Sequence, residues 1–392
     1  MSHGTMGNLL IHNARVVAPD ATIENGWVLL NEGIIVEVGS GEIDLTRTDT
    51  AMINAAGMWL IPGFIDVHVH GGAGSDFMSA DADGLSTITK FHATHGTTSI
   101  VATSLTASRE ELTAILDRTH HYMSKAMPYA QVVGVHLEGP FVSEKWRGAQ
   151  NPAFIAPPQL AWLEEWVSRY PDLIKLQTLA PETEGALDYI ERLTQLGIVA
   201  SCGHTDATYE EIIASADRGL RQATHTFNAM RSLHHREPGT VGAVLTDSRI
   251  RTEVIADGHH VHHAAIKLLV AAKGRNGVIL ITDAMEASGM PDGDYKIGEL
   301  PVQMIDGVAR LKDSGNLAGS TLTMIQAFRY MVNKVGVSVE DASQMASGNP
   351  ANQLGIDAVT GSITSGKRGD LLLLDDTLTL HNVWIGGRPH SL

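Results

Sequence analysis

The sequence predicts an α/β fold: a (β/α)₈ barrel of the TIM type with a small β-sandwich domain formed from both chain ends. Eight short apolar runs alternate with longer amphipathic stretches through the middle of the chain, as expected when helices cover parallel strands. Polar residues close most of these runs, and the two chain ends share a different pattern of short β-type runs. We therefore expect residues 1–61 and 357–392 to form the β-sandwich and residues 62–356 to form the barrel.

The length and composition of the chain fit one large domain with a smaller companion. With 392 residues, of which 43% are hydrophobic and 18% charged, the chain can bury a sizeable core and is typical of compact globular proteins. Its formal charge of −16 offers no basic stripe to nucleic acid or to an anionic membrane, so we expect neither as a partner. An anionic substrate would need a local cluster of Arg and His.

The cysteine content and the N-terminus predict a cytoplasmic protein. The chain has one cysteine, Cys202, so it cannot form an intrachain disulfide and does not require an oxidising compartment. Its N-terminus lacks a basic region followed by an apolar run. No stretch approaches the roughly 18 uninterrupted apolar residues of a membrane-spanning helix.

Short β-type runs fill the first part of the chain, from Leu9 to about Ile61, where Gly, Asn and Pro interrupt them. No helical period is present in this part. The end of the chain returns to the same style, with apolar runs in residues 362–376 and 381–390 joined by turn residues. This similarity predicts that both ends share one β module.

The barrel prediction rests on a count of the apolar runs in the middle of the chain. Eight strand-then-helix units over about 250 residues match a closed barrel better than an open sheet. Barrels of this kind place their chemistry at the C-terminal ends of the strands, where this chain has His, Glu and Asp. The runs cover residues 63–70, 97–104, 131–140, 173–181, 197–204, 222–230, 251–260 and 277–285.

Two histidines end the first run and are candidate metal ligands. His68 and His70 alternate along a strand, so their side chains point to the same face. Neutral imidazole is a common ligand of zinc-like metals, and the following Gly-Gly suits a sharp turn at a barrel mouth. The alternative is a pair of hydrogen-bonded core histidines.

Three further residues of ligand type follow later runs. Glu138 would be buried in the barrel mouth and needs a cation, which a metal or an Arg could supply. His204 and His225 lie where apolar runs give way to polar loops. Together with the histidine pair, they supply five ligands, enough for two metals or for one metal and a vestigial second position.

Asp283 closes the eighth run and is the candidate general base. A carboxylate beside a metal-activated water can accept its proton and later deliver that proton to a leaving amine. The alternative role is an N-cap for the segment that follows.

A series of motifs between residues 62 and 324 resembles the N-acetylglucosamine-6-phosphate deacetylases of the amidohydrolase superfamily. The terminal β segments also look like that family's split β-sandwich, which ends in a GxIxxGKxxDLL run, here residues 361–372. The resemblance covers nearly the whole chain. The motifs, in chain order, are PGFIDVHVHGG, GVHLEGPF, CGHTDA, THTFNAM, REPG, IADGHHV, ITDAM and LAGSTLTM.

The resemblance implies roles for the candidate metal and catalytic residues. It makes Glu138, His204 and His225 the principal ligands of a divalent metal, with His68 and His70 available for a second ion. It also makes Asp283 the catalytic acid and base. We expect one or two ions per subunit, zinc first, with iron or another transition metal as alternatives.

The resemblance also implies how a phosphorylated amino sugar would be bound. Asn228 and the Ala229 backbone would contact the phosphate, Arg236 would reach in from the other subunit of a homodimer, and His260 would contact the sugar. An always-charged guanidinium is a good phosphate clamp, which answers the objection from the acidic net charge. Gln150 occupies a position where some relatives carry a substrate-contacting His.

The implied reaction is hydrolysis of N-acetylglucosamine 6-phosphate to glucosamine 6-phosphate and acetate, a step of amino-sugar catabolism and recycling. Two other enzymes remain as alternatives: a deacetylase of the galactosamine epimer and a cyclic-amide hydrolase. The latter commonly uses a carboxylated lysine on strand four, where this chain has Lys175 too early. A catalytically dead, oligomeric binding protein is a further alternative, against which the complete ligand set argues.

Overall fold

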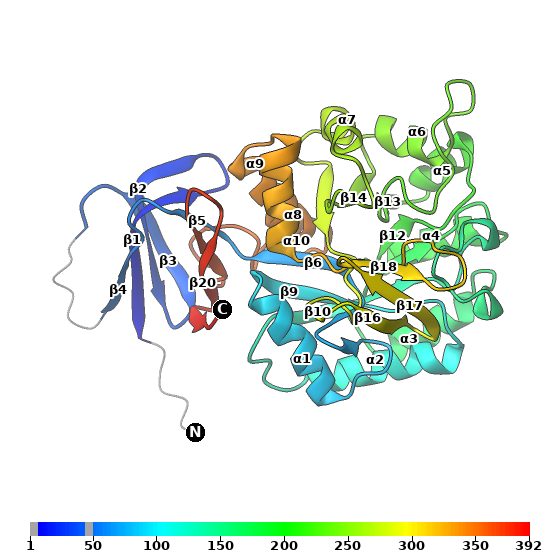
Figure 1. The fold of residues 1–392 in the computed structure, drawn as a ribbon, viewed down its shortest axis with the longest axis horizontal. Helices are drawn as coiled ribbons and strands as arrows, with labels where there is room; N and C mark the ends of the chain where they lie inside the picture. The colour runs from blue at the N-terminus through cyan, green and yellow to red at the C-terminus, as the bar shows by residue number, and fades with distance from the viewer. Residues whose placement is uncertain (1–6, 44–49) are drawn as a thin grey trace.

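The computed structural model describes residues 7–43 and 50–392, and it has the predicted architecture of a parallel barrel beside a separate sheet from both chain ends (Figure 1). Residues 1–6 and 44–49 of the predicted β-sandwich lie outside the described residues. Among the described residues, no helix combines the length and apolar character needed to cross a bilayer.

Eight strands form the barrel in chain order, and each overlaps one predicted apolar run. They are β6 (Phe64–Val69), β9 (Thr97–Thr103), β10 (Gln131–Glu138), β11 (Ile174–Leu179), β12 (Val199–Cys202), β13 (Leu220–Ala223), β14 (Arg251–Ile255) and β15 (Val278–Ile281). Backbone hydrogen bonds join the ends of the first and last strands: the Asp283 N–H donates to the His68 carbonyl at 2.8 Å, and the His70 N–H donates to the Ala284 carbonyl at 2.8 Å. The predicted closed barrel is confirmed.

Strand six is shorter than the predicted run of residues 222–230, because β13 ends at Ala223. His225, Phe227 and Ala229 have φ angles of 30°, 82° and 48°, in the left-handed region that a strand cannot contain. The rest of the run is therefore a loop that turns over the barrel mouth.

A helix follows each barrel strand. Ser108 and Thr208 begin two of these helices with capping boxes, each closed by a Glu three residues later. The helices are α1 (Ala82–Ala93), α2 (Arg109–Met123), α3 (Leu160–Arg169), α4 (Ala186–Gln195), α5 (Tyr209–Asp217), α6 (Gly239–Thr246), α7 (His263–Lys273) and α8 (Met324–Tyr330). Short helical segments also follow β10, namely η1 (Glu144–Trp146) and η2 (Pro152–Phe154), and follow α8, namely η3 (Met331–Val335), α9 (Val339–Ser343), η4 (Gln344–Gly348) and α10 (Asn349–Gln353).

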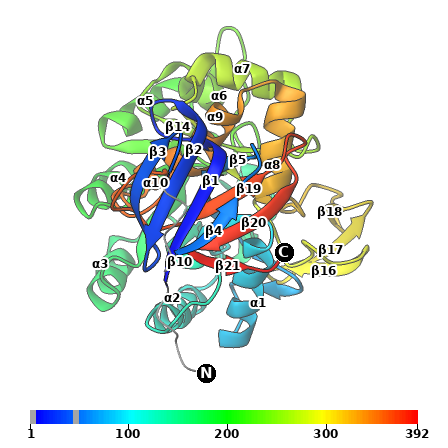
Figure 2. The ribbon, with the colours of Figure 1, turned by 90° about the vertical axis from the view of Figure 1, so that its left-hand side faces the viewer.

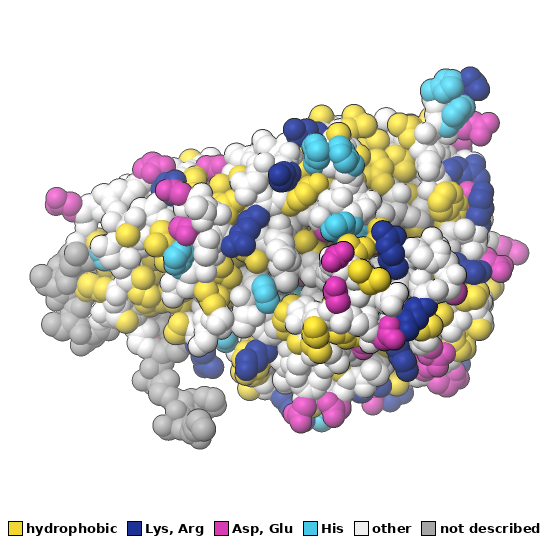
Figure 3. Space-filling view, in the orientation of Figure 1, with side chains coloured by type: hydrophobic (Ala, Val, Ile, Leu, Met, Phe, Trp, Pro, Cys, Tyr) yellow, Lys and Arg dark blue, Asp and Glu magenta, His cyan; other side chains and the backbone are white. Residues whose placement is uncertain are grey.

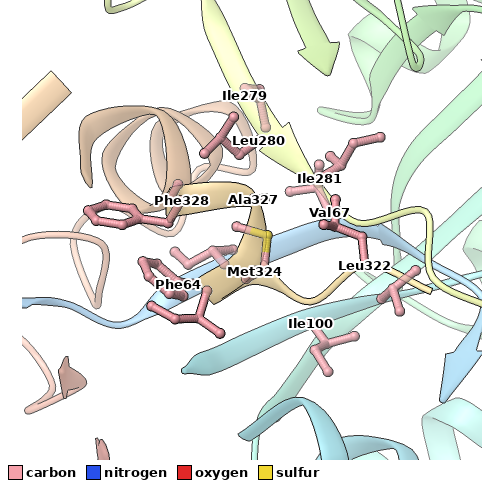
Figure 4. Close-up of a cluster of buried hydrophobic side chains, with 14 of the residues drawn as sticks. Phe64, Val67, Ile100, Ile279, Leu280, Ile281, Leu322, Met324, Ala327 and Phe328 are labelled. Atoms are coloured by element: carbon pink, nitrogen blue, oxygen red, sulfur yellow. The ribbon is translucent and has the colours of Figure 1, made fainter. Parts of the chain in front are cut away.

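The main hydrophobic core packs α8 against the two strands that close the barrel (Figure 4). The rings of Phe64 on β6 and Phe328 on α8 lie 5.3 Å apart between centroids, and both side chains are fully buried. Met324 and Leu280 belong to the same cluster. Burial of each such side chain stabilises the fold by about 1.5–3 kcal/mol. This packing holds in place the strand ends that carry His68 and Asp283.

The two chain ends meet in one eight-stranded sheet, which Figure 2 shows in front of the barrel. β5 pairs antiparallel with β19, so that Leu60 faces Leu373 across the sheet. β5 ends at Pro62 and β6 begins at Phe64, so one residue separates this sheet from the barrel. The strands are β1 (Asn8–Val17), β2 (Thr22–Asn31), β3 (Ile34–Ser40), β4 (Thr50–Asn54), β5 (Trp59–Pro62), β19 (Leu371–Leu374), β20 (Leu380–Ile385) and β21 (Arg388–His390).

A three-stranded antiparallel sheet inserted after β15 was not predicted. It consists of β16 (Gly293–Ile297), β17 (Leu300–Ile305) and β18 (Val308–Leu311), and it lies at the barrel mouth in Figure 1. Buried and exposed residues alternate along β17, and an Asp-Gly turn at 306–307 joins it to β18. A short ribbon of β7 (Gly71–Gly72) and β8 (Ser75–Asp76) follows β6.

Candidate active site

Six predicted metal and catalytic residues converge at the C-terminal mouth of the barrel. They form two groups whose potential ligand atoms lie within 4.8 Å of one another, and all six side chains are buried. A cavity of about 510 Å³ opens over them. The groups are Glu138 with His204 and His225, and His68 with His70 and Asp283.

The first group joins residues that follow β12 and β13 to the last residue of β10. The Nε2 atoms of His204 and His225 each lie 3.2 Å from Glu138 Oε1 and 3.1 Å from one another. His204 Nδ1 lies 2.9 Å from the Trp146 carbonyl, and His225 Nδ1 lies 3.2 Å from the Asn228 carbonyl. Because a carbonyl only accepts, each neutral ring carries its proton on Nδ1 and presents a bare Nε2.

The second group gathers residues from the two strands that close the barrel. His68 Nε2 lies 3.3 Å from His70 Nε2 and 3.5 Å from Asp283 Oδ1, while His70 Nε2 lies 3.1 Å from Asp283 Oδ1. Glu138 also reaches this group, with Oε1 3.4 Å from His68 Nε2 and Oε2 3.5 Å from His70 Nε2. The Glu138 carboxylate therefore lies between the two groups.

The donor set fits a divalent cation. The Nε2 lone pairs of His204 and His225 both face Glu138 Oε1 at 3.2 Å, an arrangement that requires a positive charge. A tetrahedral ion with bonds of about 2.0–2.1 Å holds its ligands about 3.3–3.4 Å apart, close to the spacing within both groups. Although burial lowers it, the carboxylates of Glu138, Asp283 and Glu253 raise the pKa of His68 to about 10, which also reflects the demand for positive charge here.

Three of these residues adopt left-handed backbone conformations. His204, His225 and Asp283 have φ angles of 47°, 30° and 52°. Such conformations cost about 1–3 kcal/mol each and persist only where surrounding contacts hold them, as they commonly do at functional sites. Asp283 is held by its N–H bond to His68 and by the Ser320 N–H, which donates to the Asp283 carbonyl at 2.7 Å.

The electrostatic environment keeps both carboxyl groups ionised. Burial alone would raise the pKa of Asp283, but the charge of His68 and a hydrogen bond from His70 hold that pKa below its usual value. Burial also opposes ionisation of Glu138, but the charge of His68, whose Nε2 lies 3.4 Å from Glu138 Oε1, holds the pKa of Glu138 well below its usual value. An ionised Asp283 is competent as a general base.

Four of the predicted substrate-binding residues, Gln150, Asn228, Ala229 and His260, line the same cavity. Gln150 Nε2 donates to Glu138 Oε2 at 2.7 Å, so this residue contacts a candidate metal ligand as well as lining the cavity. The position of the His260 ring is fixed by Asp257 Oδ2, which lies 2.6 Å from its Nδ1.

Arg236 does not line the cavity of its own chain. It is exposed on the loop between β13 and α6, and its Nη1 contacts His235 Nε2 at 2.7 Å. Figure 3 shows histidine and basic side chains on a tip that projects where Figure 1 draws this loop. Among the described residues, the basic side chains that line the cavity are Lys145 and Arg310.

Sequence reasoning did not identify three polar residues of this region. Glu253 lies in the middle of β14, and an acid inside an apolar run was the available signal. Arg310 belongs to the unpredicted sheet, and Asp257 follows β14, which ends at Ile255. Lys175 lies in the first half of β11 and does not line the cavity, which removes the lysine that a cyclic-amide hydrolase would use.

Comparisons with known proteins agree with this geometry. The sequence profile described as "Amidohydrolase family" matches residues 59–389. An N-acetylglucosamine-6-phosphate deacetylase of Vibrio furnissii is 41% identical over 329 residues, which cover 84% of this chain and 82% of the relative. An N-acetylgalactosamine-6-phosphate deacetylase of Escherichia coli O157:H7 is 38% identical over 377 residues, covering 96% and 98% of the two chains.

A solved structure with a similar fold is a mutant N-acetyl-D-glucosamine-6-phosphate deacetylase from Mycobacterium smegmatis in complex with N-acetyl-D-glucosamine 6-phosphate. It superposes with a TM-score of 0.92 at 34% identity, covering 98% of this chain and 99% of the other.

Proposed function

This chain belongs to the amidohydrolase family, and we propose that it hydrolyses N-acetylglucosamine 6-phosphate to glucosamine 6-phosphate and acetate in amino-sugar catabolism. The observation that carries the proposal is the meeting of two histidine and carboxylate groups at Glu138, with Asp283 beside them at the barrel mouth. Relatives named for this reaction, from several organisms, support the choice of substrate.

The metal would be held by the residues that already converge. Glu138, His204 and His225 would hold a first divalent ion, and His68 and His70 a second, with zinc as the preferred metal because the ligands are imidazoles and carboxylates at tetrahedral spacing. When bound, such an ion supplies a Lewis acid that polarises the amide carbonyl and acidifies the attacking water.

Asp283 would perform both proton transfers of the reaction. Its ionised carboxylate accepts a proton from the attacking water as the bond from the water oxygen to the acetyl carbon forms. It then delivers that proton to the amide nitrogen as the carbon–nitrogen bond breaks, so that the sugar leaves as an amine and the acetyl group as acetic acid, which ionises to acetate. Asp283 Oδ1 lies 3.1 Å from His70 Nε2, next to the position proposed for the second ion.

The rest of the cavity would bind the phosphorylated sugar. Asn228 and the Ala229 backbone would contact the phosphate, and His260, oriented by Asp257, would contact the sugar. We propose a homodimer in which the partner's Arg236 completes this site, because Arg236 is exposed and lies outside the cavity of its own chain. We also place the reaction in the cytoplasm, since the single buried cysteine requires no oxidising compartment.

The galactosamine epimer is a second candidate substrate. The Escherichia coli relative named for N-acetylgalactosamine 6-phosphate matches this chain over nearly its whole length. The two sugars differ in the configuration of one hydroxyl group, so the same metal ligands and Asp283 would serve either one.

The test is acetate release from N-acetylglucosamine 6-phosphate, from its galactosamine epimer and from unphosphorylated N-acetylglucosamine. We expect the first sugar to have the highest kcat/KM and the unphosphorylated sugar the lowest. Asp283→Asn should lower kcat by about 10²–10⁴-fold, the range that general acid–base catalysis supplies. Full activity of this variant would contradict the mechanism, and rapid turnover without the phosphate would contradict the substrate.

A further inference from the structure

Glu253 is a buried carboxylate that contacts His68 and His225 from behind and that the proposed reaction does not use. It lies on β14 with 0% exposure and accepts hydrogen bonds from three directions. Gln222 Nε2 donates to its Oε1 at 2.6 Å, the His225 N–H donates to its Oε2 at 3.1 Å, and His68 Nδ1 lies 3.0 Å from the same Oε2. A carboxylate in this position needs a functional or structural reason, because burial of an ionised group is costly unless partners satisfy it.

The contact with His68 determines which nitrogen of that ring faces the cavity. A carboxylate only accepts, so His68 Nδ1 carries a proton and donates it to Glu253. The opposite nitrogen, Nε2, then faces His70, Glu138 and Asp283 at 3.3–3.5 Å. A carboxylate behind a histidine ligand both orients the ring and increases its basicity toward a metal.

His68 differs in this respect from the other three histidines of the site. His204 and His225 are oriented by neutral backbone carbonyls. His70 Nδ1 is buried and has no hydrogen-bond partner among the described residues. Of these four histidines, His68 is therefore the one whose ring is oriented by a charged side chain. The orientation of the group formed by His68, His70 and Asp283 thus depends on Glu253.

The same carboxylate also supports the other group. Glu253 Oε2 accepts the backbone N–H of His225, the residue with a φ angle of 30°. The Thr226 N–H donates to the Glu253 carbonyl at 2.9 Å and fixes the next residue of the loop. One side chain on β14 thus holds a histidine ring in one group and a strained histidine backbone in the other.

We propose that Glu253 is a positioning residue that orients His68 and His225 together and so couples the two metal-binding groups. It does not contact the substrate or the reacting atoms. Its removal should weaken metal binding in both groups, and most in the group that contains His68. This inference rests on the proposed metal-dependent function.

The test compares Glu253→Gln with Thr252→Val in equilibrium metal titrations of the metal-stripped protein with zinc. Gln keeps the size of the side chain but loses the charge and one acceptor. Thr252 is the adjacent buried polar residue of β14; its hydroxyl bonds to the Gly277 carbonyl and not to a metal-binding residue. We expect zinc affinity to fall about 10–100-fold in Glu253→Gln and to stay within about twofold of the wild type in Thr252→Val.

A measurement on the wild-type protein serves if Glu253→Gln does not fold. Nitrogen-15 spectra of histidine-labelled, zinc-loaded protein should show a His68 Nδ1 proton protected from exchange. A bare Nδ1 on His68, or unchanged zinc affinity and stoichiometry in a folded Glu253→Gln variant, would overturn the inference. A wild-type protein that binds no zinc would instead overturn the proposed function, so the two failures are distinguishable.

Discussion

At the scale of single residues, the shared position of Glu138 makes it the residue on which both metal-binding groups depend. Its Oε1 lies 3.2–3.4 Å from the Nε2 atoms of His204, His225 and His68. Glu138→Gln removes the negative charge that holds the cation while preserving the size of the side chain. We expect the purified variant to lose bound metal, with an affinity at least about 100-fold lower, because a first ligand matters more than the residues behind it.

Metal content per subunit, measured by elemental analysis after dialysis, checks this prediction. Glu286→Gln is a suitable control, since that carboxylate accepts the Lys296 N–H and belongs to neither group. A Glu138→Gln protein that retained the wild-type metal content would contradict the assignment of this residue.

Asp257 offers a second prediction at the same scale. Its Oδ1 accepts the backbone N–H groups of His259 and His260 at 2.8 Å, and its Oδ2 lies 2.6 Å from His260 Nδ1. In Asp257→Asn, an amide N–H can face that nitrogen and turn the ring away from its native orientation. A charged hydrogen bond contributes about 1.5–3 kcal/mol, so we expect KM for the phosphorylated sugar to rise at least about tenfold with a smaller change in kcat.

Steady-state kinetics of acetate release separate the two parameters. His259→Ala provides the comparison, because that side chain is exposed and does not line the main cavity. If Asp257→Asn instead lowered kcat by that factor and left KM unchanged, Asp257 would act on the reaction and not on sugar binding.

At the scale of secondary-structure elements, Asp206 links three loops at the barrel mouth. Its carboxylate accepts Lys145 Nζ and Trp146 Nε1 of η1 at 3.0 and 2.8 Å, and Arg231 Nη2 from the loop after β13 at 3.0 Å. Trp146 in turn provides the carbonyl that orients His204. In Asp206→Asn we expect faster hydrogen exchange in residues 143–150 and a higher KM, with the barrel intact.

The control for this prediction is Asp217→Asn, which removes a carboxylate hydrogen-bonded to Arg249 away from the mouth.

The stability that Asp206 contributes depends on pH with a definite sign. Hydrogen bonds from Arg231, Trp146 and Lys145 hold the pKa of Asp206 below its usual value despite some burial. Its contribution to stability is therefore complete above the unfolded pKa, about 3.9, and is lost as the pH falls toward the folded pKa. Acid unfolding of wild type and Asp206→Asn should converge at low pH.

The elements differ in how well the sequence predicts them. The eight barrel strands are buried on both faces, so each appears as an apolar run, and those runs were found. The run ending at Met230 was too long because His225 and Phe227 adopt left-handed conformations that side-chain periodicity does not reveal. The sheet of β16, β17 and β18 was missed although the Asp306-Gly307 turn marks it, because its strands expose every second residue.

The same reasoning explains which site residues were found. Ligands at strand ends stand out because His and Glu interrupt apolar sequence, whereas Glu253 acts from within a strand through contacts with residues far away in the chain. The division of the chain into residues 1–61 with 357–392 and residues 62–356 stays a prediction. So does the role of Arg236, which depends on a second copy of the chain.

At the scale of the whole molecule, the proposed dimer can be tested by complementation. Arg236→Ala should raise KM for the phosphorylated sugar, because the partner's Arg236 no longer holds the phosphate, while Asp283→Asn should remove turnover. When the two variants are unfolded together and refolded as mixed dimers, the subunit with an intact Asp283 receives the partner's Arg236 from the other variant. Each mixed dimer then contains one complete site, and we expect activity at low substrate concentration to recover above that of either variant alone.

If a basic side chain of the same subunit binds the phosphate, the mixed dimers should show no recovery of activity. Arg310 lines the cavity and has no ion-pair partner among the described residues. If Arg310 holds the phosphate instead, each subunit supplies its own phosphate-binding cation, so mixing the two variants restores no activity. Arg310→Ala would then raise KM for the phosphorylated sugar and leave the unphosphorylated sugar unaffected. The acidic net charge of −16 makes this comparison informative, since among the described residues Lys145 and Arg310 are the Lys and Arg side chains that line the cavity. Recovery on mixing, with a small effect of Arg310→Ala, would assign phosphate binding to the partner's Arg236.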